Sequence, residues 1–169
     1  MRIIELERKA CEGQQLILSY DSYAVWEAVF ENSEESSVVR IERKKTEKKH
    51  AERTFDLLCR ADSRVLGLLD DTGLRGIAEI SGGKEREPAR LETLCIFEGY
   101  RRRGYGTLLL NRAKEKVRLS GSGALTVRVP FDNSGAVSFL QGQGFVITGY
   151  DPAPARDFAS GLFMTCVLH

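Results

Sequence analysis

One stretch near the middle of the chain joins a strand pattern to a glycine turn and then to a long helical pattern. Ala89–Phe97 (ARLETLCIF) has the apolar and β-branched composition of a buried strand, and EGYRRRGYG follows it. From Gly106, apolar residues recur at helical spacing as far as Val117. A glycine turn before a helix presents backbone N–H groups and the positive end of the helix dipole. With Arg101–Arg103 beside it, this turn predicts a phosphate or pyrophosphate site.

Two familiar nucleotide-binding loops do not fit this turn. A phosphate-binding loop of the Walker A type needs Gly-Lys-Ser/Thr, and Tyr105-Gly106-Thr107 has no lysine. A dinucleotide fingerprint needs a third glycine where Leu109 stands, after the first strand of a βαβ unit. An arginine-rich turn that merely caps a helix remains the alternative.

The rest of the chain predicts a mixed α/β order, with antiparallel hairpins early and one strand–helix–strand unit late. Residues 14–30 are expected to hold one or two strands, and Glu47–Arg60 to form a helix after a short strand. Asp70-Asp71-Thr72-Gly73 is expected to be a hairpin turn. Further strands are expected at Arg64–Leu69, Leu74–Ile80, Ala124–Val129, Phe145–Thr148 and Leu162–Leu168, with a short helix at Ala136–Gln141.

Composition narrows the functional classes. The chain has 169 residues, 42% of them hydrophobic, which suits a single globular domain. Its 25 basic and 24 acidic residues give no overall attraction to nucleic acid or to an anionic membrane. No secretory signal or membrane span is evident, so a cytoplasmic location is expected.

Metal chemistry is not expected either. The four cysteines are scattered without CxxC spacing, and neither of the two histidines has a ligand-like neighbour. No metal site is therefore predicted, and four reduced thiols are expected.

The wider pattern resembles the GNAT family of acyl-CoA-dependent N-acetyltransferases. The resemblance covers about Val65–Cys166 and rests on Arg101-x-x-Gly104-x-Gly106, on Asn133…Phe139 and on Gly144-Phe145. Within the family, the layout most resembles streptothricin acetyltransferase-like members. The resemblance implies a mostly antiparallel sheet splayed between two parallel strands and flanked by helices. It also implies one domain over residues 1–169, with a variable acceptor-side part (1–63) and an acetyl-CoA-binding core (64–169).

The resemblance also implies where acetyl-CoA, the acyl-donor cosubstrate, is held. The pantetheine arm is expected to pair with the strand before the turn, and the pyrophosphate to lie on the turn. Asn133 is expected to contact the pantetheine arm, to cap the following helix, or both. The implied cofactor-binding residues are Leu94, Cys95, Ile96, Arg101, Arg102, Arg103, Gly104, Tyr105, Gly106, Thr107 and Asn133.

The implied chemistry is direct attack of an amine on the thioester. The attacking ammonium must first lose a proton, and Glu92 is the predicted base because it is the only acid within Leu91–Phe97. Backbone N–H near Leu94 is expected to face the developing oxyanion. Many members carry a tyrosine after the phenylalanine of the late helix as general acid. Here Leu140 follows Phe139, so the acid is unassigned.

The expected acceptor is an amine of a small molecule or a protein, and the expected oligomeric state is a monomer or a homodimer. Glu27, Glu31, Glu34 and Glu35 would suit a cationic acceptor, although surface solvation explains them equally well. A non-catalytic acyl-CoA-binding module is one alternative. The other is nucleic-acid binding through Arg101–Arg103 and Arg43–Lys49, which the balanced charge disfavours.

Overall fold

The computed structural model describes residues 1–32, 36–57, 59–84, 87–151 and 160–168. The chain forms two compact units, each gathered from separate segments. The first unit contains Met1–Leu18, Arg53–Val127 and Thr165–His169, and the second contains Ser19–Glu52 and Arg128–Met164. The predicted functional division at residue 63 stays a prediction.

The sheet is mixed and mostly antiparallel, as the sequence predicts. In the first unit, β1 (Arg2–Leu6), β4 (Arg64–Asp70), β5 (Gly73–Gly82) and β6 (Ala89–Ile96) pair antiparallel in that order. β7 (Ala124–Pro130) then pairs parallel with β6, and β9 (Gly161–Val167) and β8 (Val146–Asp151) complete the strand order. β1 and the short α1 (Arg8–Cys11) have no counterpart among the sequence-predicted elements.

The predicted hairpin between the strands of residues 64–80 is confirmed. Asp70 pairs with Gly73 across a two-residue turn, and the Asp70 carboxylate accepts hydrogen bonds from the N–H groups of Thr72 (2.8 Å) and Gly73 (3.1 Å). An aspartate at this position commonly stabilises a turn through such bonds. The Asp70 side chain therefore holds the backbone of this turn in place.

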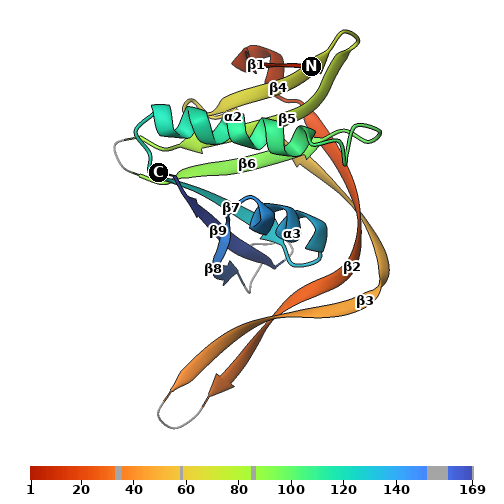
Figure 1. Cartoon of the computed structure of the whole chain (residues 1–169), viewed down its shortest axis with the longest axis vertical. Helices are drawn as coiled ribbons and strands as arrows, with labels where there is room; N and C mark the ends of the chain where they lie inside the picture. Colours follow the sequence, from red (N-terminus) through yellow and green to blue (C-terminus); the bar gives the residue numbers. More distant parts are fainter. Residues whose placement is uncertain (33–35, 58, 85–86, 152–159, 169) are drawn as a thin grey trace. The chain divides into compact units, whose positions relative to one another are not determined.

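The predicted long helix is α2 (Tyr105–Leu119), which packs on β4, β5 and β6 (Figure 1). Its apolar side chains recur on one face, where Leu109, Leu110, Ala113 and Val117 are buried. The guanidinium of Arg64, which pairs with Ile80 in the sheet, donates to the Lys116 carbonyl at 3.5 Å. The Arg64 and Ile80 side of the sheet therefore faces α2.

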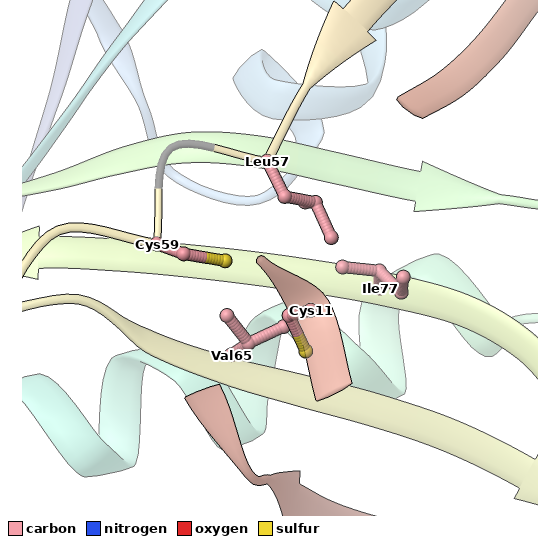
Figure 2. Packing of buried hydrophobic residues seen from close by; sticks show 5 residues of the cluster. All are labelled: Cys11, Leu57, Cys59, Val65 and Ile77. Carbon is pink, nitrogen blue, oxygen red and sulfur yellow. The ribbon is translucent and has the colours of Figure 1, made fainter. Parts of the chain in front are cut away.

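The other face of the first unit carries a separate apolar cluster. Figure 2 shows Cys11, Leu57, Cys59, Val65 and Ile77 converging from α1, the segment after β3, β4 and β5. Val65 and Ile77 alternate with the residues that face α2, so this cluster lies on the opposite side of the sheet. Because residues on both faces are buried, the apolar residues of β4 and β5 are not confined to alternate positions.

β2 (Gln15–Asn32) and β3 (Ser37–Asp56) form a two-stranded sheet of their own (Figure 1). The predicted helix at Glu47–Arg60 is therefore wrong, because residues as far as Asp56 belong to β3. Two lysines of β3 pair with acids on β2: Lys44 Nζ lies 2.5 Å from Glu27 and Lys48 Nζ lies 2.9 Å from Asp21. Such cross-strand partners cannot be seen from local spacing, and they favour the strand.

The second unit also contains α3 (Ser134–Gly142), which confirms the predicted short helix. Val137 and Leu140 of α3 are buried in this unit, as are Phe145 and Met164. Ser22 of β2 and Ser134 of α3 share a buried hydrogen bond of 2.8 Å, and the hydroxyl of Tyr20 donates to Asp132 at 2.8 Å. These contacts fix the start of α3 against β2.

Candidate acyl-donor site at the glycine turn

The strand before the turn, β6, is held along its length by β5. Leu94, Cys95 and Ile96 pair with Ala78, Ile77 and Gly76. The two backbones approach so closely that a Cβ on Gly76 would lie 2.7 Å from the Cys95 carbonyl oxygen. Glycine is therefore required opposite the end of β6.

The parallel pairing of β6 with β7 is short. It joins Ala89–Leu91 to Leu125–Val127, three residue pairs, and its register ends there. Leu94, Cys95 and Ile96 lie beyond those pairs on β6, where the pantetheine arm is expected. Their contact with the cosubstrate stays a prediction.

Glu92 occupies an irregular position in β6. The register passes from Ile80↔Leu91 to Glu79↔Thr93, so Glu92 is an extra residue in β6 and forms a β-bulge. The Ser81 hydroxyl donates a short hydrogen bond to Glu92 Oε1. Ser81 and Glu79 are two residues apart and therefore lie on one face of β5. The half-buried Glu92 carboxylate, which Ser81 binds, lies on that same face. No further partner of Glu92 is found in the described parts of the chain.

The turn itself is built from left-handed backbone positions. Gly99, Arg102 and Gly104 have φ angles of 81°, 62° and 81°. Gly104 is the N-cap of α2 and has no side chain to satisfy the first amides, and Leu108 N–H makes the first helical bond to the Gly104 carbonyl at 3.0 Å. The amides of Tyr105, Gly106 and Thr107 therefore have no partner within the helix. No acid stands in the first helical turn, so the positive dipole end is uncompensated.

The three arginines of the turn differ in their surroundings. Arg101 Nε donates to the Ile96 carbonyl at 2.8 Å, so this side chain ties the turn to the end of β6. Arg102 and Arg103 are exposed, and within the described residues they form no ion pair. Arg103 lies 5.9 Å from the centre of the Tyr100 ring. The turn thus combines one structural arginine with two cations available to an anion.

Cys95 is not a candidate nucleophile. Burial raises the pKa of its thiol to about 11. A thiol with that pKa is almost wholly protonated at neutral pH, and the thiolate is the reactive form. Cys95 is therefore unsuited to carry an acyl group.

In the second unit, Asn133 caps α3: its side-chain oxygen accepts from Ala136 N–H at 3.0 Å. The predicted capping role is confirmed, and the contact with pantetheine stays a prediction. Leu140 is 4% exposed and packs in the core of this unit. It has no hydroxyl that could serve as an acid.

The predicted acidic acceptor residues are engaged in ion pairs where the structure describes them. Glu27 pairs with Lys44, and Glu31 pairs with Arg40 at 3.1 Å. Glu34 and Glu35 lie outside the described residues. These pairs favour the interpretation of Glu27 and Glu31 as surface charges of β2.

One buried acid escaped the sequence analysis. Glu79 is fully buried, and its Oε1 accepts from Cys59 N–H at 2.7 Å. Cys59 has a φ of 41°, so this bond holds a strained residue in the segment between β3 and β4. The signal was a single charge inside the apolar run GIAEIS, where an acid needs a buried partner.

The described residues contain no cluster of side chains able to hold a metal ion. None of their helices is both long and apolar enough to span a membrane.

Comparison with known proteins gives a consistent result. The model of the acetyltransferase (GNAT) family matches residues 23–145. Streptothricin acetyltransferase of Streptomyces lavendulae is 30% identical over 101 residues, 59% of this chain. The match spans only 53% of that relative, about half its length.

Solved structures confirm the predicted fold class. Nourseothricin acetyltransferase matches with a TM-score of 0.74 at 22% identity, covering 99% of this chain and 98% of the other. A Bacillus anthracis str. Ames protein assigned as a streptothricin acetyltransferase, in complex with acetyl coenzyme A, has a TM-score of 0.72 at 16% identity and covers 98% of both chains. The PaiA N-acetyltransferase of Thermoplasma acidophilum, in complex with coenzyme A, has a TM-score of 0.54 at 25% identity and covers 63% of this chain and 61% of the other.

Proposed function

The chain belongs to the acetyltransferase (GNAT) family, and from this premise we propose that it transfers an acetyl group from acetyl-CoA to a primary amine. The acceptor is a small molecule or a protein, and the amine attacks the bound thioester directly. The observation that carries the proposal is the turn at Gly104, where uncapped helix amides meet exposed Arg102 and Arg103. That donor set suits a pyrophosphate.

Acetyl-CoA supplies an acetyl group activated as a thioester. The amides of Tyr105, Gly106 and Thr107 would hold its pyrophosphate, and the backbone of Leu94–Ile96 would pair with its pantetheine arm. Backbone N–H near Leu94 would stabilise negative charge on the carbonyl oxygen. Each of these groups belongs to the rigid end of β6 or to the first turn of α2.

Glu92 is the proposed general base. Because of the bulge, its carboxylate lies on the same face of the sheet as Ser81, and the Ser81 hydroxyl donates a hydrogen bond to Oε1. The carboxylate would take the proton of the attacking ammonium, directly or through a water. The amine nitrogen adds to the thioester carbonyl carbon and puts negative charge on the carbonyl oxygen. The C–S bond then breaks, the electron pair leaves with the thiolate, and the second proton lost by the nitrogen goes to that thiolate, directly or through water. A thiol pKa of about 8.5 makes departure feasible without the tyrosine that Leu140 replaces.

Three measurements test this proposal. Calorimetric titration of the wild type with coenzyme A is expected to show binding. Release of free thiol from acetyl-CoA is then followed with an amine panel that includes streptothricin, nourseothricin, a polyamine and lysine-containing peptides. Glu92→Gln is expected to lower kcat by about 10²–10⁴-fold with little change in coenzyme A affinity. Ser81→Ala is the matched control, because it removes the hydrogen-bond partner and keeps the carboxylate.

The buried Leu140 favours one competing function, a non-catalytic acyl-CoA-binding module. Tight coenzyme A binding without thiol release across the whole panel would favour that module. Full activity of Glu92→Gln at every pH would remove Glu92 as the base.

A further inference from the structure

We infer that Tyr100 is a positioning residue, whose ring orients the Arg103 guanidinium toward the phosphates of acetyl-CoA. The inference rests on the proposed function and adds to it a brace between the β4–β5 turn and the glycine turn. The residues of this brace are Asp70, Arg75, Tyr100 and Arg103, all within the first unit.

Arg75 is the fixed end of the brace. Its Nε donates to Asp70 Oδ2 at 2.7 Å, and the two side chains are only 18% and 24% exposed. The Asp70 carboxylate is itself held by the amides of its own turn. The Arg75 carbonyl accepts from Phe97 N–H at 2.9 Å, which ties the same residue to the start of the glycine turn.

Tyr100 lies between two cations. The Arg75 guanidinium is 4.5 Å from its ring centre and the Arg103 guanidinium is 5.9 Å from it, both within cation–π range. Tyr100 N–H also donates to the Phe97 carbonyl at 3.1 Å. The ring is thus fixed by its own turn and by Arg75, whereas Arg103 is exposed and makes no ion pair in the described part of the chain.

The arrangement affects binding through conformational entropy. A long exposed arginine loses rotamer freedom when it closes on a phosphate. A ring that already restricts the Arg103 guanidinium in the free protein lowers that loss. The ring contact adds no negative charge beside Arg103, so its positive charge stays available to an anion.

The test is a double-mutant cycle on coenzyme A binding. Arg103→Gln is expected to raise the Kd about five- to tenfold, through loss of a charged contact. Tyr100→Leu is expected to raise it about two- to fivefold, and Tyr100→Phe, which keeps the ring, to leave it near the wild-type value. If Tyr100 acts through Arg103, the Tyr100→Leu/Arg103→Gln variant binds no more weakly than Arg103→Gln alone.

Two further readouts separate positioning from general damage. With an identified acceptor, Tyr100→Leu raises the KM for acetyl-CoA and leaves kcat unchanged. Arg112→Gln is the matched control, because Arg112 loses the same charge on the exposed side of α2, where it pairs with Glu115. Titration with 3′-dephospho-coenzyme A shows which phosphate Arg103 contacts. If Arg103→Gln still raises the Kd for this ligand, Arg103 contacts the pyrophosphate. If the variant and the wild type bind it equally, Arg103 contacts the 3′-phosphate.

The outcomes are distinct. Wild-type protein that does not bind coenzyme A overturns the proposed function. Wild-type protein that binds, together with a Tyr100→Leu variant of equal affinity, overturns only the brace. Additive losses in the double variant also overturn it, since they show that Tyr100 does not act through Arg103.

Discussion

Two highly charged segments of the chain, α2 and β3, fold by different means. In α2 the apolar residues Leu109, Leu110, Ala113 and Val117 recur at helical spacing and are buried against the sheet. In β3 the long run of lysines and glutamates has no such period, and its basic residues pair with acids of β2. Burial determines the conformation of the first segment, and a partner strand determines that of the second.

The comparison shows that charge composition alone does not distinguish helix from strand. Both segments contain residues with good helix propensity. Only the apolar period of α2 is a local signal, because it reflects the face that the helix buries. The strand pairing of β3 depends on residues about 17–30 positions earlier in the chain, such as Glu27 for Lys44 and Asp21 for His50.

The largest expected difference between α2 and the β2–β3 sheet is in the cost of truncating an apolar side chain. Leu109→Ala on α2 removes a fully buried side chain and should lower the free energy of unfolding by about 2–5 kcal/mol. Ile17→Ala on β2, where the side chain is 66% exposed, should change it by less than about 0.5 kcal/mol. Urea denaturation of both variants measures the contrast, and equal losses would contradict it.

The buried Glu79 tests the segment that links β3 to the sheet. Glu79→Ala leaves the Cys59 N–H without its acceptor and should cost about 1–3 kcal/mol of unfolding free energy. Glu79→Gln keeps an acceptor oxygen and is expected to retain most of the stability. If both variants were equally destabilised, the charge rather than the hydrogen bond would be the important property.

Acid titration compares two carboxylates. The Arg75 guanidinium lowers the pKa of Asp70, and Lys48, with a smaller effect of His50, lowers the pKa of Asp21. A folded-state pKa below the ordinary value of 3.8 means stability that is present above that pH and lost as the pH falls below it. Asp70→Asn should therefore lower Tm at pH 7, and its difference from the wild type should shrink as the pH falls below 3.8 and vanish only below the depressed folded-state pKa of Asp70. Asp21→Asn should lower Tm less, since its partners are more exposed.

The smallest expected effect is on the β2–β3 ion pairs. Glu27→Lys should shift Tm by no more than about 2 °C, because exposed ion pairs contribute little. Adding Lys44→Glu should restore the wild-type value, since it re-forms the pair with reversed sign. A double variant that melts below both single variants would show that strand register does not depend on this pair.

The sequence predicts the backbone of the glycine turn and of α2 better than it predicts the β2–β3 sheet. The glycine turn, the helix after it and the hairpin at Asp70 follow from local signals: positive-φ glycines, an apolar period and a turn-forming aspartate. The bulge at Glu92 and the Tyr100 brace do not, because each depends on the register or contact of residues distant in sequence. Glu79 is predictable only in part. An acid within an apolar strand shows in the sequence, but the Cys59 N–H that it binds does not.

The exposed cations at the glycine turn also have a kinetic consequence. Arg40, Lys44 and Lys48 of β3 are paired with acids of β2. Arg102 and Arg103 are exposed and form no ion pair in the described residues, so they are a local source of positive potential. A polyanion that approaches this turn is steered by that potential, so its association rate constant should fall as salt is added. The dissociation rate constant, set by contacts at short range, should respond far less. Although the net charge of the chain is near zero, its association with acetyl-CoA would thus depend on salt as that of a basic protein does.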